Sequence, residues 1–262
     1  MYVLKHAVVL ALTLPLLAVP LLAQPTPTKP ATPAAVTKDV DPLALDVLRA
    51  VAEPVEKAQS FTFKALVSEE ELATDGQIVT FFHTVDITVQ RPDKIHLIFR
   101  GRGQRVDYYG GNGTLTMFSP DANFYTTRPA KSTIDENLTD LNAKGVDMPI
   151  GPFLRSNLYD LAAKTVTAGY VIGRVKIYDQ DVHQLAFTAP DADFQLWVTG
   201  GENPRFVRAE IVNKKLEGKP RTTIQFLDWD LSPTVSADEF TFTKPAEAVQ
   251  ISVMPETGGK AK

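Results

Sequence analysis

The sequence predicts a mainly β fold of the α+β class, in which one strongly curved antiparallel sheet wraps over a few helices. Three observations predict it. Helical spacing of apolar residues occurs only in short stretches, several other segments alternate apolar and polar residues, and turn signals separate those segments closely. Because the linkers between such strands are short, they favour antiparallel hairpins over βαβ crossovers.

The two ends of the chain are expected to lie outside this folded part. Residues 1–23 start with basic side chains, continue with an apolar run and end at Ala23, which is the plan of a cleaved secretory signal. An uncleaved membrane anchor is the alternative, but the run is short for a bilayer span and contains prolines. Residues 24–40, rich in Pro and Thr, predict a disordered tether, and residues 254–262 a disordered tail. A single domain is therefore expected over residues 41–253.

The composition excludes several functional classes. The chain has 262 residues, of which 44% are hydrophobic, so it can bury a sizeable core. It has no cysteine, and therefore no disulfide, Cys-ligated metal centre, thiol nucleophile or acylated cysteine anchor. The net charge of −4 becomes −5 once Lys5 of the leader is removed, which argues against a nucleic-acid partner. An exported chain without cysteine fits the bacterial periplasm.

One helix is predicted to open the domain. Asp41 and Pro42 favour a helix start, because Asp is a preferred N-cap and Pro fits the first helical position. Apolar residues then recur at helical spacing up to about Ala58, namely Leu45, Leu48, Val51 and Val55. Pro54 lies inside this pattern and is expected to kink or shorten the helix.

Strands with one wet face are predicted after this helix, because the apolar period changes from 3.6 to 2. The alternating segments are residues 61–67, 79–89, 95–99, 194–198, 207–211 and 222–226. The turn signals between strands are the glycine-containing stretches 75–76, 110–113, 200–201 and 217–218.

Two helical insertions are predicted near the middle of this meander. Thr133 and Glu136 form a capping-box pattern, and Gly145 would close the helix whose apolar face is Ile134, Leu138 and Leu141. Pro152 begins a second segment with Phe153, Leu154, Leu158 and Leu161. Apolar helix faces need a surface, and the dry face of the sheet is the one available.

Motifs for catalysis or metal binding give little support to an enzyme. His83 is expected on the apolar face of its strand, as a hydrogen-bonded interior or rim histidine instead of a metal ligand or base. Residues 101–103 and 110–113 are glycine-rich, but neither leads from a strand into a helix, so neither predicts a phosphate site. There is no nucleophile-elbow or zinc-protease pattern, and residues 69–71 predict a solvated acidic strand end. We predict no enzyme activity, no cofactor and no metal.

Several motifs resemble a known family. They are Ser60-Phe61 after the first helix, the stretch 89–95 with Arg91-Pro92, the stretch 108–120, the stretch 195–198, the stretch 201–205, the stretch 226–231 and the closing stretch 240–245. In their order they resemble the periplasmic lipoprotein-carrier superfamily (LolA/LolB-like). More closely, the chain from about Asp41 to Val253 resembles the predicted periplasmic proteins called domain of unknown function 2092.

The resemblance implies an unclosed β-barrel of about eleven antiparallel strands, with helices as a lid over an apolar cavity that holds acyl chains. Arg91 matches the carrier's arginine that hydrogen-bonds the lid and holds the empty form shut. The alternative for Arg91 is a surface charge beside a strand-starting proline. The carrier's cavity-lining positions fall on Ile95, Leu97 and Phe99. Without a lipobox cysteine the chain resembles a soluble carrier, expected to be a monomer.

The predicted ligand cavity combines these positions with other large apolar side chains. The full set is Phe81, Ile95, Leu97, Phe99, Tyr109, Met117, Phe118, Phe153, Leu154, Trp197 and Phe226. The alternative is that most of these side chains fill a solid core.

Two functional hypotheses follow. The first is a periplasmic, non-enzymatic carrier whose partner is a lipid or an acylated lipoprotein, held by burial of its hydrocarbon. The second is an envelope sensor or scaffold of the same fold that binds a protein. A hydrolase is a third and weaker hypothesis, because it needs a polar cluster in the pocket.

Overall fold

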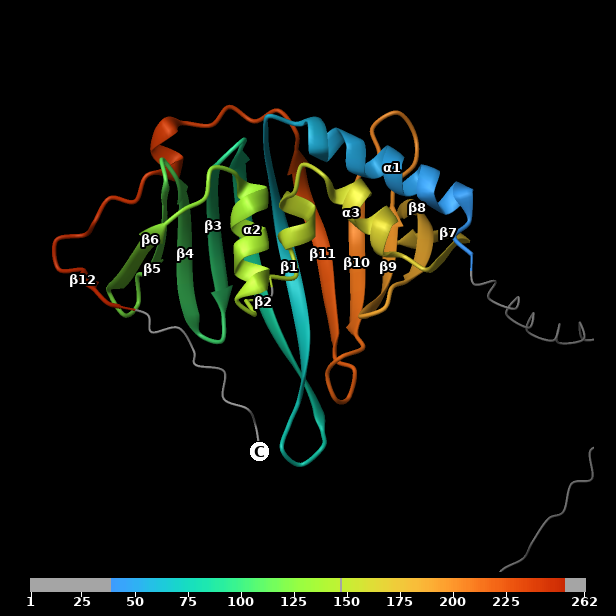
Figure 1. The fold of residues 1–262 in the computed structure, drawn as a ribbon, viewed down its shortest axis with the longest axis horizontal. Helices are drawn as coiled ribbons and strands as arrows, with labels where there is room; N and C mark the ends of the chain where they lie inside the picture. The colour runs from blue at the N-terminus through green and yellow to red at the C-terminus, as the bar shows by residue number, and fades with distance from the viewer. Residues whose placement is uncertain (1–38, 147, 253–262) are drawn as a thin grey trace, which may run out of the picture. The chain divides into compact units, whose positions relative to one another are not determined.

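The structure, a computed structural model, describes residues 39–146 and 148–252 (Figure 1). The expected signal sequence and tail, and nearly all of the expected tether, lie outside these residues. The helices are α1 (Pro42–Lys57), α2 (Ile134–Ala143) and α3 (Leu158–Thr165), with short 3-10 helices η1 (Gly151–Leu154) and η2 (Ala237–Phe240). The strands are β1 (Ser60–Leu72), β2 (Ile78–Gln90), β3 (Lys94–Gly101), β4 (Gln104–Gly111), β5 (Thr114–Ser119), β6 (Phe124–Pro129), β7 (Ala168–Ile177), β8 (Gln180–Thr188), β9 (Ala192–Val198), β10 (Phe206–Asn213), β11 (Arg221–Asp230) and β12 (Val249–Gln250).

All twelve strands form one sheet in the order β12-β6-β5-β4-β3-β2-β1-β11-β10-β9-β8-β7. The end strands β12 and β7 do not pair with each other, so the sheet is unclosed, as predicted. The part of the chain that the structure describes contains twelve strands, where about eleven were expected. The added strand is β12, whose two residues pair with β6 in the parallel sense, whereas every other pair is antiparallel.

The first helix begins and ends close to the predicted bounds. The Asp41 carboxylate accepts a hydrogen bond from the Leu43 amide at 2.9 Å, so the predicted N-cap is confirmed. Pro54 does not end the helix early. It lies in the last turn, and the Ala58 amide still donates to the Pro54 carbonyl at 3.2 Å. No helix among the described residues is both long and apolar enough to cross a bilayer.

The sheet has an inner face, covered by the three α-helices, and an outer face (Figure 1). On β1 the inner positions Phe61, Phe63, Ala65 and Val67 are buried, which confirms the predicted alternation. The same face continues onto the neighbouring strands, because Val85 lies opposite Ala65 and Phe99 lies opposite Val85.

The second predicted helical insertion is divided in two. Gly151–Leu154 forms the 3-10 turn η1, and α3 begins only at Leu158, because the chain is extended at Arg155. The first insertion agrees with its prediction: Thr133 caps α2 by accepting from the Glu136 amide at 3.1 Å, and Gly145 after the helix has a φ of +77°.

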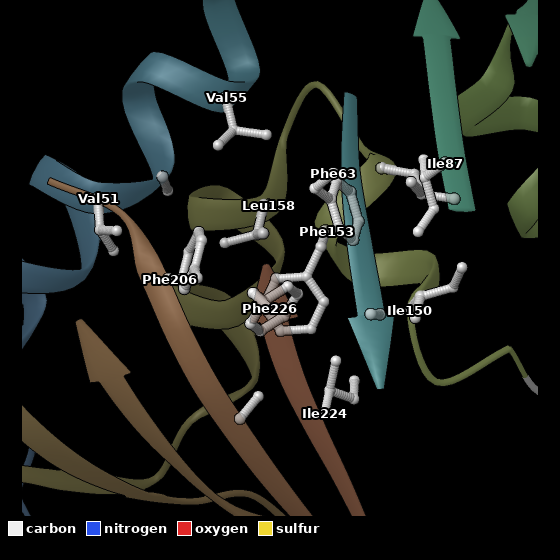
Figure 2. Packing of buried hydrophobic residues seen from close by; sticks show 14 of the residues in the cluster. Val51, Val55, Phe63, Ile87, Ile150, Phe153, Leu158, Phe206, Ile224 and Phe226 are labelled. Carbon is white, nitrogen blue, oxygen red and sulfur yellow. The ribbon is translucent and has the colours of Figure 1, made fainter. Parts of the chain in front are cut away.

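A solid core fills the space between α1, η1, α3 and the strands β1, β11 and β10. Figure 2 shows Phe153 of η1 beside Phe226 of β11, and their ring centroids are 4.7 Å apart. Phe153 also meets Phe206 edge-on at 5.1 Å, and Trp229 stacks on Phe63 at 4.2 Å. This half of the inner face is therefore packed by the protein's own aromatic side chains.

Candidate functional site

A cavity of about 820 Å³ lies under the other half of the inner face, between α2 and strands β3–β6. Small-molecule sites in proteins usually have about 300–1,000 Å³. Its lining includes the apolar residues Ile95, Leu97, Phe99, Leu115, Met117, Ile134, Leu138, Leu141, Val146, Met148 and Ile251. Its polar and aromatic lining residues include Glu69, His83, Asp93, Tyr108, Tyr109, Thr126, Arg128, Asn137 and Gln250.

The residues on the sheet side of the cavity are set by the alternation of side chains along each strand. Ile95, Leu97 and Phe99 alternate along β3 and so point to one face. Leu97 lies opposite Tyr108, and Tyr108 lies opposite Met117, so these side chains share that face across three strands.

The helix side of the cavity is α2, which is fastened to the sheet at its start. The Ile134 amide donates to the Pro92 carbonyl at 2.8 Å. The Asn137 side chain accepts from the Lys131 amide at 2.9 Å and donates to the Thr133 carbonyl at 2.8 Å. These bonds hold Leu138, a buried apolar residue of α2, against the cavity.

Five residues of the predicted set border this cavity: Ile95, Leu97, Phe99, Tyr109 and Met117. Tyr109 borders it although its ring is stacked on His96, at a centroid distance of 4.3 Å. The other six residues of the set lie elsewhere.

Phe118 and Trp197 lie on the outer face. Phe118 follows Met117 directly, and neighbouring residues of a strand point to opposite faces. Its ring packs on Phe242 of the C-terminal segment, at 5.3 Å between centroids. Trp197 likewise alternates with the buried Leu196, and the Arg208 guanidinium carbon lies 5.7 Å from its ring centroid.

Phe81, Phe153, Leu154 and Phe226 are on the inner face or under it but do not border the cavity. Phe81 is half-buried near the start of β2. The guanidinium carbon of Arg102 lies over its ring, 3.7 Å from the centroid. Phe153, Leu154 and Phe226 belong to the solid core around η1. They fill volume that the sequence interpretation assigned to a ligand.

The predicted set lacks one side wall of the cavity and much of its cover, which consists of α2, the loop after it and η1. Ile134, Leu138 and Leu141 were predicted as an apolar helix face, which is the signal that they cover something. Val146 and Met148 in the loop after α2, and Ile251 beyond β12, had no periodic pattern that could have indicated them.

Arg91 joins the sheet to the cover by four hydrogen bonds to main-chain carbonyls. Its guanidinium donates to the carbonyls of Val55, Ala58, Leu154 and Arg155 at 3.3, 3.2, 3.0 and 3.1 Å. These carbonyls lie at the C-terminal ends of α1 and η1. Carbonyls at such an end have no backbone amide of the same helix to accept a hydrogen bond from. Burial lowers the pKa of the Arg91 guanidinium, and the carboxylates of Asp135 and Glu56 oppose that shift.

The cover itself is one connected piece. The Arg155 guanidinium donates to the Asp135 carbonyl at 3.1 Å and to the Thr139 hydroxyl at 3.2 Å. The Asp135 carboxylate accepts from the Ser156 amide at 3.1 Å. Because Arg91 holds the carbonyl of Arg155, it also holds α2 through these contacts.

Two ionisable residues of the cavity lining are close to each other. His83 and Glu69 approach each other on β2 and β1, with Nδ1 and Oε2 3.7 Å apart. Burial lowers the pKa of His83, Glu69 raises it and Arg102 lowers it further. Within residues 39–146 and 148–252 there is no cluster of three or more His, Asp or Glu residues that could bind a metal ion.

Solved structures similar to this chain come from several bacteria. LprF from Mycobacterium bovis is 16% identical with a TM-score of 0.47, over 80% of this chain and 100% of that one. The lipoprotein LppX from Mycobacterium tuberculosis is 15% identical with a TM-score of 0.48, over 75% and 100%. A LolA superfamily protein from Nitrosomonas europaea is 15% identical with a TM-score of 0.31, over 76% and 97%.

Curated proteins give no match to this chain. The family model described as "Predicted periplasmic protein (DUF2092)" matches residues 44–254, which include all but the first two residues of α1, the residues that line the cavity and the solid core. The chain therefore belongs to the DUF2092 family of predicted periplasmic proteins.

Proposed function

We propose that this protein is a periplasmic, non-enzymatic carrier that holds hydrocarbon of a lipid or an acylated lipoprotein in the cavity under α2. The observation that carries the proposal is the cavity itself. It has a volume of about 820 Å³ and lies next to the solid core, and apolar side chains from β3, β5 and α2 line most of it. Such a space favours a guest that is itself apolar.

The energetics of burial support an acyl chain as that guest. Each methylene moved from water into an apolar site contributes about 0.8 kcal/mol. A chain of about 14 carbons would gain roughly 11 kcal/mol, before the cost of losing its freedom is subtracted. Burial therefore sets the affinity, and no covalent or metal chemistry is required.

The four hydrogen bonds of Arg91 hold the cover closed, and breaking them would allow the guest to be released. They connect β2 to the end of η1, and η1 continues from the loop that contains Met148 of the cavity wall. Breaking them would free the cover without disturbing the strands. A carrier needs such a difference between a closed and an open state, because a ligand shifts the two populations only by its differential affinity.

Export would precede this function. We infer that residues 1–23 are removed as a signal sequence and that residues 24–40 remain as a tether ahead of the domain. N-terminal sequencing of the secreted protein tests this, since a mature chain that begins near Gln24 is expected and one that retains Met1 contradicts it.

A fluorescent polyene fatty acid tests the carrier proposal, with two variants that differ by one position on α2. Leu141 borders the cavity, whereas Asn142 is exposed. Leu141→Glu places a charge against the cavity, and Asn142→Glu places the same charge in water. We expect saturable fluorescence with the wild type and with Asn142→Glu, and strongly weakened binding with Leu141→Glu.

Two results would contradict the proposal. One is a wild-type protein that takes up no fatty acid. The other is equal uptake by both variants, since the hydrocarbon would then be bound away from α2. Retrieval of one defined envelope protein by both variants alike would favour the sensor or scaffold hypothesis instead.

A further inference from the structure

Arg128 is a cation at the edge of the cavity with few partners. It lies on β6 opposite Leu115, on the face that borders the cavity. Its side chain is 38% exposed. Its contact with a carboxylate is a long one, 3.6 Å from Nη1 to Oδ2 of Asp140, which exceeds hydrogen-bond distance.

Asp140 is more closely bound to another cation. Its Oδ2 lies 2.6 Å from Nζ of Lys144, one turn further along α2. A hydrogen bond from Lys144, with smaller contributions from Lys131 and Arg128, lowers the pKa of Asp140. Asp140 thus interacts with three cations, Lys144, Lys131 and Arg128, and its short contact is with Lys144.

The acidic groups of the cavity wall lie elsewhere. Glu69 is on β1, five strands away from Arg128 on β6, and is close to His83. Asp93 lies in the turn after β2, where Oδ2 accepts from the Asn112 amide at 3.2 Å. Each acidic group of the wall therefore has another partner: Glu69 is close to His83, and Asp93 is bonded to the turn between β4 and β5.

A guest in the cavity would remove water from the Arg128 guanidinium. A planar guanidinium has five N–H donors in a geometry that suits carboxylate and phosphate. A cationic group in that position would leave the donors without acceptors, which is costly when water is excluded. A neutral hydroxyl could accept a hydrogen bond, but a weaker one than a charged oxygen accepts. An anionic group would satisfy them.

We infer that the cavity selects an amphiphile with an anionic head group, a carboxylate or a phosphate, which Arg128 binds while the hydrocarbon lies between α2 and β3. The inference rests on the proposed function and names the class of ligand. The overall net charge of −4 repels anions at long range, so a preference for an anion has to arise locally.

Displacement of the neutral dye N-phenylnaphthylamine tests this, with four competitors that share one saturated chain. They carry a carboxylate, a phosphate, a hydroxyl and an ammonium head. We expect the wild type to bind both anions about tenfold more tightly than the alcohol, and the amine least tightly. The stronger of the two anions then distinguishes a fatty acid from a phospholipid as the source.

Variants assign the preference to Arg128. Arg128→Gln should bind the anions no more tightly than the alcohol while its affinity for the alcohol is unchanged, and Arg128→Lys should keep part of the preference. Arg174→Gln removes the same charge from an exposed position on β7 and should behave as the wild type. Thermal unfolding of each variant checks that it is folded.

The outcomes separate this inference from the proposed function. If the wild type binds the alcohol as tightly as the anions, or if the preference survives in Arg128→Gln, the head-group inference is overturned and the carrier stands. If none of the four compounds displaces the dye and the dye itself does not bind, the carrier proposal fails.

Discussion

Replacing Arg91 by leucine tests how the cover of the cavity is held closed. The substitution keeps an apolar stem and removes four hydrogen bonds to the carbonyls of α1, its C-cap and the end of η1. A hydrogen bond to a charged group contributes about 1.5–3 kcal/mol, and such contributions are not additive. Because water reaches part of this site, we expect a total loss of about 3 kcal/mol.

Two measurements follow from that value. For a domain of about 150–250 residues, 1 kcal/mol shifts the melting temperature by about 2–4 °C, so Arg91→Leu should melt about 6–12 °C lower yet remain folded. If the four bonds exist only in the closed form, the open population rises by up to about 100-fold, and the apparent affinity for a fatty acid rises with it. Stopped-flow uptake of the polyene fatty acid should be faster.

Arg91→Lys is the matched control. An ammonium keeps the charge but is a point donor that cannot reach four carbonyls arranged around a planar fork, so its melting temperature and uptake rate should lie between those of the wild type and Arg91→Leu. Unchanged melting and unchanged uptake in Arg91→Leu would refute the role of Arg91 as a latch.

Three further substitutions have distinct expected outcomes. Phe226→Ala removes a ring from the solid core and should cost about 3–5 kcal/mol in chemical denaturation, with fatty-acid affinity unchanged in the protein that remains folded. Gly110→Ala places a methyl group 2.6 Å from Cγ2 of Ile95 and 2.9 Å from Cδ2 of Leu115, both in the cavity wall, so it should weaken fatty-acid binding, and wild-type affinity would contradict this placement. Because burial lowers the pKa of His83 from its ordinary 6.5, the unfolded chain binds the proton first, so stability should fall as pH decreases below about 6.5 and level off below the folded pKa. His83→Asn should reduce that slope, and an identical pH profile in denaturant titrations would exclude His83 as its source.

Much of the sheet could be predicted from the sequence because its signals are local. The alternation in 61–67 and 79–89 requires only that one face be buried, and the capping residues Asp41 and Thr133 act within one helical turn. The twelfth strand could not be predicted, since β12 has two residues and its pairing with β6 depends on the course of the segment before it.

The cavity was predicted less well, for two different reasons. Phe118 and Trp197 were chosen as large aromatic residues, although the pleat that places Met117 and Leu196 inward already places them outward. Phe153 is a different case. Apolar side chains that pack against each other and those that line a void have the same composition, and only the position of η1 relative to β11 decides between them.

A carrier of this kind must have the space under α2 filled by a guest in the cell. Native mass spectrometry of the protein purified from a periplasm without detergent measures this most directly. We expect a chain that carries one additional mass of an acyl-containing amphiphile, lost on organic extraction and restored by added fatty acid. A bare polypeptide mass in every preparation, with no mass gained from added fatty acid, would contradict it.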